Sequence, residues 1–228
     1  WPVRLGRPDG QMRLFADGGF FTPDRKARLL PVKPRAPHNP TCADYPFVLN
    51  TGRIRDQWHT MTRTGLTPRL LAHISEPFVE MHPRDAAANG LRDGELAQLS
   101  TRWGQMLARV QCHSGQQECT VFVPMHWTGA LSRKGRVGPL VNPVTDPISG
   151  QPENKHTPVA VRPWRPAWQG FWLHVDGAEL PETDYAVSIR SEHGWRHELA
   201  GSESADLQAL ADRWLPLSAG EWLEYSDV

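Results

Sequence analysis

The sequence has few cysteines, and none of them has the spacing of a cysteine cluster. Cys42, Cys112 and Cys119 are the only cysteines among 228 residues, and no two of them show CxxC spacing. An odd number without that spacing argues against a disulfide framework and indicates a reducing, cytoplasmic compartment. Because an iron–sulfur cluster needs a full set of cysteine ligands, we expect this chain to hold none.

Long hydrophobic runs and an excess of one charge are also missing. No apolar stretch approaches the ~20 residues that a membrane-spanning helix requires. The 25 Lys and Arg residues balance 25 Asp and Glu residues. This balance provides no bulk field for nucleic acid or an anionic membrane, so we expect neither as a partner. Any anionic ligand must instead be held by local groups.

The motifs of several common enzyme classes are absent as well. The sequence contains no GxGxxG, GxxxxGK[ST] or GxSxG pattern, which excludes Rossmann, P-loop and nucleophile-elbow sites. Its histidines show no HExxH spacing, so we expect no metal site.

Turn-forming residues, in contrast, are abundant. The 19 Gly and 21 Pro residues favour short strands and many turns over a helical bundle. The pattern predicts a mainly β fold with one short helix over residues 82–90, where Pro83 takes an early helical position. A closed β-barrel is the economical arrangement, because closure hides the strand edges. The expected strands are residues 45–50, 78–81, 95–103, 106–112, 120–124 and 157–161.

We divide the chain into three parts. Residues 1–44 form an extended lead-in segment from a preceding domain, with a small hairpin around Asp17-Gly18-Gly19. Residues 45–162 form the barrel. Residues 163–228 form a small α+β appendage, with a helix over residues 204–215. Because the chain opens on Trp1 rather than Met, we expect it to be an excised C-terminal region.

The first candidate site is the polar stretch over residues 50–65, directly after the first expected strand. Gly52 lets a ligand approach the backbone, and Arg53 can form a forked pair with a phosphate. Trp58 offers a flat face to a ring system, and hydroxyls come from Thr51, Thr60, Thr62 and Thr64. These are the parts of a pyrophosphate and heterocycle site. The alternative is a solvated loop with scattered hydroxyls.

The second candidate site is the stretch over residues 141–156. Its Asn-Pro, Asp-Pro and Gln-Pro steps predict a loop of defined shape without secondary structure. Asn142 presents both a donor and an acceptor, which suits a pterin or guanine edge, and Lys155 adds a point charge. The alternative is an ordinary connector braced by proline.

A third cluster, Met125-His126-Trp127, follows the expected strand over residues 120–124. These side chains either line the mouth of a cavity or pack at its rim. The residues alone leave both interpretations open.

The order of these motifs resembles that of a known family. The stretches TGRIRDQWHTMTRTG, SEPFVEMHPRDAAANGLRDGE, VFVPMHW and VNPVTDPISGQPENKHTPVAV follow one another as in the C-terminal molybdopterin-dinucleotide-binding domain of molybdenum oxidoreductases. Within that superfamily the chain is most similar to bacterial assimilatory nitrate reductase catalytic subunits, whose lead-in resembles LFADGGFFTPDRKARLLPV. The resemblance covers residues 1–162. Residues 163–228 resemble, more loosely, a stretch that leads towards a missing [2Fe-2S] module.

The resemblance implies a double-psi β-barrel that shares a bis-molybdopterin guanine dinucleotide cofactor with missing domains. It places the [4Fe-4S] and [2Fe-2S] centres and the molybdenum ligand outside this chain, so no catalytic residue is expected here. Met125, His126 and Trp127 fall near a position that approaches substrate in related enzymes. The residues that match the family's cofactor contacts are Thr51, Gly52, Arg53, Gln57, Trp58, His59, Thr60, Thr62, Asn142 and Lys155.

The resemblance also implies a function for the complete enzyme. That enzyme reduces nitrate to nitrite in nitrate assimilation, with electrons from a donor protein or a reductase subunit. We expect this chain to clamp the cofactor against the earlier domains of the same subunit and to be inactive alone. Two alternatives stay open. One is a formate dehydrogenase or another oxo-transferase, and the other is a stand-alone double-psi barrel that binds proteins or peptides.

Overall fold

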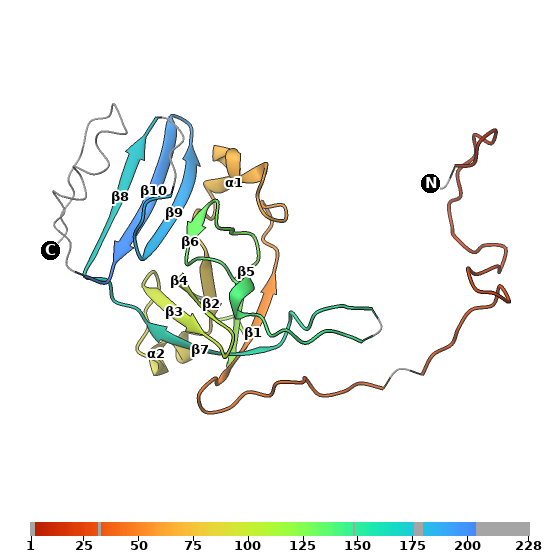
Figure 1. Cartoon of the computed structure of the whole chain (residues 1–228), viewed down its shortest axis with the longest axis horizontal. Coiled ribbons are helices and arrows are strands. Elements are labelled where there is room, and N and C mark those ends of the chain that lie inside the picture. The colour runs from red at the N-terminus through yellow and green to blue at the C-terminus, as the bar shows by residue number, and fades with distance from the viewer. Residues whose placement is uncertain (1–2, 32, 148, 176–179, 204–228) are drawn as a thin grey trace. The chain divides into compact units, whose positions relative to one another are not determined.

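The computed structural model describes residues 3–31, 33–147, 149–175 and 180–203 (Figure 1). The chain divides into two compact units, Trp1–Ala36 and Pro37–Val228. The described residues of the first unit form turns and no helix or strand. The hairpin predicted around Asp17 is therefore wrong. The Gly18 N–H donates to the Phe15 carbonyl, and the Gly19 N–H donates to the Asp17 carboxylate at 3.1 Å, so a side chain closes this turn without a strand ladder.

The second unit is built on a closed barrel of six strands, in the order β1-β5-β2-β4-β3-β7. Two pairs, β1 with β5 and β2 with β4, run parallel, and the other neighbours run antiparallel. The mainly β prediction with a closed barrel is confirmed, and the two parallel pairs agree with a double-psi arrangement. The barrel strands are β1 Phe47–Gly52, β2 Phe78–Met81, β3 Leu96–Ser100, β4 Gln105–Cys112, β5 Thr120–Pro124 and β7 Thr157–Pro163.

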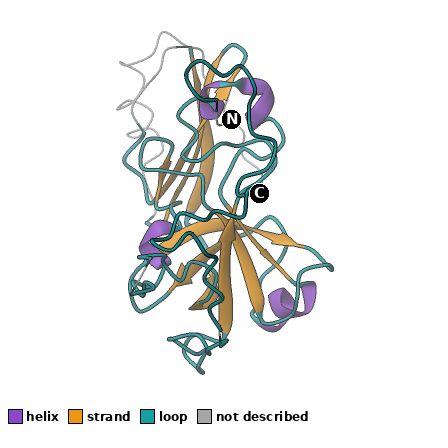
Figure 2. Cartoon of the chain, turned by 90° about the vertical axis from the view of Figure 1, so that its right-hand side faces the viewer, coloured by secondary structure: helices purple, strands orange, loops and turns teal. Residues whose placement is uncertain are grey.

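The helices in the described part of the chain are few and short, as Figure 2 shows. The predicted helix over residues 82–90 is confirmed as α2, Pro83–Ala88, with Pro83 in its first turn and the His82 ring accepting from the Arg84 N–H. None of the described helices is long and apolar enough to cross a membrane. The remaining short elements are η1 Thr64–Leu66, α1 Pro68–Leu71 and η2 Gly138–Leu140.

A second sheet packs against the outside of the barrel. Its order is β6-β9-β10-β8, with β6 Ser132–Arg133, β8 Trp168–His174, β9 Tyr185–Ser191 and β10 Gly194–Gly201. Strand β6 lies within the stretch assigned to the barrel, yet it pairs with β9 of the expected appendage. The helix predicted over residues 204–215 lies outside the described residues.

Strand β4 of the barrel contributes apolar side chains to two clusters, one inside the barrel and one between the barrel and the second sheet. Met106 and Ala108 face the barrel interior, whereas Leu107 between them packs in a second cluster with Tyr185 and Val187 of β9. Successive side chains of a strand point to opposite faces, so a strand covered on both faces is apolar at nearly every position.

A partly buried ion pair lies where these two layers meet. Arg109 of β4 donates to the Glu76 carboxylate at 2.9 Å, and the Tyr185 hydroxyl donates to the same carboxylate at 2.9 Å. Burial raises the pKa of the Tyr185 hydroxyl well above its ordinary value, and the negative charge of Glu76 adds to this rise. Tyr185 therefore stays protonated as a donor, and the three groups join the barrel to the sheet.

Candidate functional site

The parallel pairing of β1 and β5 decides where two of the predicted clusters lie. Gly52 at the end of β1 is the register partner of Pro124 at the end of β5. The chain that follows each strand therefore leaves the barrel at the same edge. Directly after the strands, the Met125 N–H donates to the Gly52 carbonyl at 2.9 Å. Residues 53–63 and 125–127 are thus neighbours despite their separation in sequence.

His126 fixes the first of these loops from inside. Its Nε2 accepts from the Ile54 N–H at 2.9 Å, and its Nδ1 lies 2.6 Å from the His59 carbonyl oxygen. An acceptor at Nε2 leaves the proton on Nδ1, which then donates to His59. The ring has no exposed surface, and burial lowers the pKa of His126. It is a neutral, internal support of the loop rather than a free group.

The loop over residues 53–63 has a buried side and an exposed side. Gln57 and Met61 are buried, whereas Trp58 is 62% exposed. The Arg53 guanidinium lies 5.2 Å from the centroid of the Trp58 ring, within the range of a cation–π contact. His59 has a φ of 41°, an unusual backbone angle that turns the chain between Trp58 and Met61. The exposed side therefore presents a cation and an aromatic face together.

The second loop, residues 143–156, projects from the barrel in Figure 1 and is shaped by one side chain at its base. The amide nitrogen of Asn142 donates to the carbonyls of Glu153 and His156 and to the hydroxyl of Thr157, all within 3.1 Å. Its amide oxygen accepts from the Val144 N–H at 3.0 Å. Both ends of the Asn142 side chain are occupied by this loop itself, and the residue is buried. Asn142 therefore organises this loop through both ends of its side chain.

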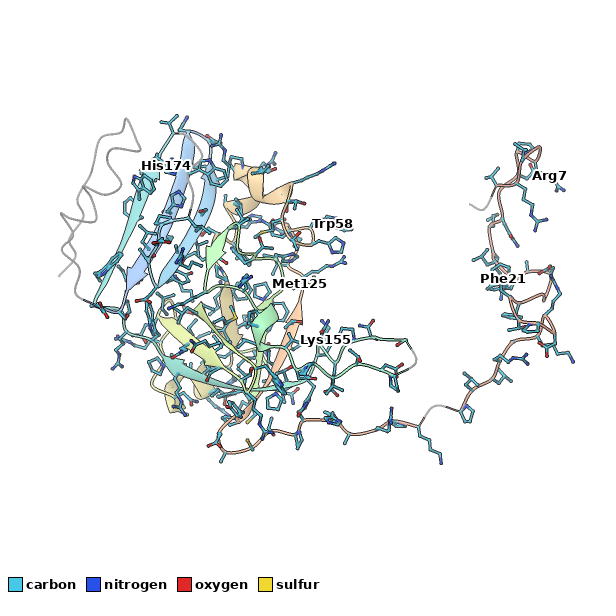
Figure 3. The ribbon with its side chains drawn as sticks, in the orientation of Figure 1. Arg7, Phe21, Trp58, Met125, Lys155 and His174 are labelled. Atoms are coloured by element: carbon cyan, nitrogen blue, oxygen red, sulfur yellow. The ribbon has the colours of Figure 1, made fainter. Side chains whose placement is uncertain are left out.

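The two loops meet beside the end of β1. The Thr51 hydroxyl donates to the Asn154 carbonyl at 3.3 Å, and the Lys155 ammonium donates to the Thr51 carbonyl. Residues about a hundred positions apart in sequence are thereby joined, so the base of the second loop contacts the end of β1, directly before the first loop. Figure 3 shows Trp58, Met125 and Lys155 along the same side of the folded unit.

A crowded glycine and several polar groups without partners lie at or near this junction. A Cβ added to Gly52 would lie 2.9 Å from the Phe122 ring and 3.7 Å from the Lys155 ammonium, so a larger residue would crowd the loop base. Among the described residues, Arg53 and Lys155 have no acidic partner within ion-pair distance. The buried Oε1 of Gln57 has no donor in the described part of the chain. Unpaired cations and an orphaned acceptor are groups that a ligand can satisfy.

The structure separates the predicted site residues by their surroundings. Thr51, Gly52, Arg53, Trp58 and Lys155 lie together at the junction, with Met125 beside them. Gln57, His126, Trp127 and Asn142 are buried. The side chains of His59, Thr60 and Thr62 are exposed on the first loop.

Sequence reasoning missed two groups that shape the site. Thr157 is fully buried, and its hydroxyl accepts from both the backbone and the side-chain N–H of Asn142. The sequence signal for a buried Thr157 was its position at the start of an apolar strand. Asp56 lies between Arg55 and His73, and these two hydrogen bonds lower the pKa of the Asp56 carboxyl to about 2. The contact with Arg55 could be predicted from the sequence because the two residues are adjacent. The contact with His73, 17 residues away, could not.

Comparisons with known proteins agree with this geometry. Residues 47–158 match the model of the molybdopterin dinucleotide binding domain, so the match includes both loops and their junction. These residues belong to that domain family. The described residues include no group of three or more His, Cys, Asp and Glu that could hold a metal ion.

The proteins that are similar to this chain include two nitrate reductases. A nitrate reductase of Klebsiella oxytoca is 53% identical over 69% of this chain and 18% of its own length. The assimilatory nitrate reductase catalytic subunit of Bacillus subtilis is 33% identical over 72% of this chain and 22% of its own length. The F420-dependent formate dehydrogenase subunit alpha of Methanocaldococcus jannaschii is 31% identical over 68% of this chain and 22% of its own length. The chain thus spans 18 to 22% of the length of these relatives.

Proposed function

We propose that this chain is the cofactor-clamping C-terminal part of a molybdenum-dependent nitrate reductase of the assimilatory type. The observation that carries the proposal is the junction of the two loops, where Thr51 bonds to both Asn154 and Lys155. The junction lies within the residues that match the molybdopterin dinucleotide binding domain. The similarity to nitrate reductases supports nitrate as the substrate of the complete enzyme.

In this proposal the groups of the junction and the buried Gln57 of the first loop bind the dinucleotide. Arg53 and Lys155 neutralise its phosphate charges, since a chain of zero net charge supplies no bulk attraction. Gly52 lets the backbone approach the ligand, and the Gln57 Oε1 accepts from one of its donor groups. Trp58 covers one face of a ring system. When bound, the cofactor supplies the oxygen-atom transfer chemistry, and this chain supplies its position and electrostatic environment.

The wider setting belongs to the same proposal. The earlier domains of the subunit provide the other half of the cofactor pocket and the iron–sulfur centres, and a donor protein or reductase subunit provides electrons. The enzyme acts in nitrate assimilation in the cytoplasm, and residues 45–162 form the cofactor-binding domain. Met125 is the member of the third cluster with an exposed surface, so we assign it the substrate-facing position.

The test uses the complete subunit with Arg53→Ala or Lys155→Ala. Each variant removes one charge from an exposed group, so the fold should stay intact while the molybdenum and guanine nucleotide content falls. A charge-assisted hydrogen bond contributes about 1.5–3 kcal/mol, which corresponds to roughly tenfold or more in cofactor affinity. Arg162→Ala is the matched control, because Arg162 is exposed on β7 and takes no part in the junction. Unchanged cofactor content in both variants would count against the assignment.

A formate dehydrogenase is the second candidate, and the similarity to the Methanocaldococcus jannaschii enzyme favours it. Nitrate-dependent and formate-dependent electron transfer by the complete subunit separate the two candidates directly. Formate oxidation without nitrate reduction would replace the proposed substrate and leave the cofactor-binding role unchanged.

A further inference from the structure

A small cavity in the second unit is lined by residues other than those of the loop junction. It has a volume of about 110 Å³, and its walls come from three separate stretches of chain. None of its lining residues belongs to the proposed dinucleotide site. The residues that matter for its chemistry are Asn39, Cys42, Tyr45, Arg102, Trp103 and Pro158.

The walls of this cavity are held in place by hydrogen bonds that do not involve its interior. Cys42 and Tyr45 exchange two backbone hydrogen bonds, of 3.2 and 3.1 Å, which close residues 42–45 into a turn. On the opposite side, the Thr101 hydroxyl accepts from the Trp103 N–H at 3.2 Å and donates to the Leu140 carbonyl at 3.0 Å. The cavity is therefore preformed by the fold.

The donors of the cavity lack acceptors in the described part of the chain. The side-chain nitrogen of Asn39 is buried and has no hydrogen-bond partner there. Arg102, which lines the same cavity and is exposed to solvent, has no acidic partner among the described residues. A buried donor without an acceptor is costly, so an arrangement of this kind favours a ligand that supplies acceptors.

We propose that this cavity binds a small planar oxyanion, of which nitrate is the probe. A water molecule occupies about 30 Å³ of liquid, so the cavity has room for roughly three or four non-hydrogen atoms. The planar fork of an arginine matches a planar oxyanion, and the Asn39 amide supplies a further donor. The ring of Trp103 and the two prolines at positions 40 and 158 provide the apolar walls.

One acidic side chain, Glu153, lies close enough in space to compete with an anion for the Asn39 amide. The Glu153 carboxylate accepts from the His38 N–H at 3.2 Å through Oε1, and its Oε2 is buried without a donor. Glu153 does not line the cavity. A small side-chain movement would let the Asn39 amide donate to the Glu153 Oε2. An anion in the cavity would have to displace that hydrogen bond.

The experiment titrates the full, isotopically labelled chain with sodium nitrate at constant ionic strength, and with sodium chloride as the comparison salt. We expect saturable chemical-shift changes at the Asn39 side-chain amide and the Arg102 guanidinium, with nitrate and not with chloride. Asn39→Ala should weaken nitrate binding about tenfold, the usual size for one hydrogen bond to a charged group. Asn39→Asp keeps the side-chain size but replaces the donor amide with a negatively charged carboxylate. It should therefore abolish nitrate binding. Arg162→Ala should leave the titration unchanged.

Other outcomes would overturn the proposal. A linear response to nitrate, or an equal response to chloride, means that the cavity has no oxyanion site. A shift of the Asn39 amide in Glu153→Gln, without any response to nitrate in the native chain, means that Glu153 is its partner. Native-like spectra and melting temperatures of the Asn39 variants ensure that lost binding is not lost folding. The result does not depend on the cofactor content of the complete subunit.

Discussion

Replacement of His126 by Ala tests how the loop after β1 is held. The ring is fully buried and bridges the Ile54 N–H and the His59 carbonyl. His126→Ala leaves both partly buried backbone groups without their partner, and a hydrogen bond of this kind contributes about 0.5–1.5 kcal/mol. The free energy of unfolding should therefore fall by about 1–3 kcal/mol, with some further loss from the cavity left by the ring.

The assay is urea denaturation of the full chain, together with amide hydrogen exchange at Ile54. We expect lower stability and faster exchange of the Ile54 N–H in the variant. His193→Ala is the matched control, because His193 is exposed in the turn between β9 and β10 and should change stability by less than about 0.5 kcal/mol. If the two variants are equally stable, the ring does not support the loop.

The same variant carries a pH signature. Burial lowers the pKa of His126 below its ordinary value of 6.5, although the bond to the His59 carbonyl opposes this shift. The unfolded chain then binds more protons than the folded chain as the pH falls through 6.5, so stability from this group is present above that pH and is lost below it. The stability difference between the native chain and His126→Ala should shrink between pH 8 and pH 5.5. A constant difference would refute the neutral, accepting ring.

Three further variants test other parts of the structure. Glu76→Ala leaves the buried Tyr185 hydroxyl and the partly buried Arg109 without their shared acceptor, so the free energy of unfolding in urea denaturation should fall by about 1–3 kcal/mol; an unchanged free energy of unfolding would show the pair to be dispensable. Asn142→Ala removes the side chain that ties the second loop to its base, so limited proteolysis should cut that loop faster, and an unchanged cleavage rate would contradict this. Gly52→Ala places a Cβ 2.9 Å from the Phe122 ring, so in the complete subunit it should lower both the melting temperature and the cofactor content; an unchanged melting temperature with full cofactor content would show that the loop base tolerates the added Cβ.

The barrel was predictable because its signals are local. Short apolar runs, each ended by a turn residue, mark the strands, and Pro83 marks the start of α2. Strand β6 was not predictable, since two residues carry no periodicity and its pairing with β9 depends on long-range packing. The turn at Asp17 has hairpin residues, but its side chain satisfies the backbone locally, and no apolar strands flank it.

The contacts of the candidate-site residues could be predicted only in part. The residue types placed Asn142 in a polar loop and His126 directly after a strand, where it could either line the mouth of a cavity or pack at its rim. The partners of the His126 ring lie 72 and 67 residues away in sequence, so no local pattern shows them. The hydrogen bonds of Asn142 within its own loop could not be predicted either, because its partners depend on how that loop folds.

The division between internal and exposed polar groups has a physical consequence for the site. The side chains of His126 and Asn142 form hydrogen bonds with backbone groups of the two loops. The loops therefore have their shape before a ligand binds. Arg53 and Lys155, held beside them, keep their charges free of acidic partners in the described part of the chain. Substitution of the internal pair should therefore reduce stability and cofactor content together. Substitution of the exposed pair should reduce cofactor content alone, because their charges act on the ligand and not on the fold.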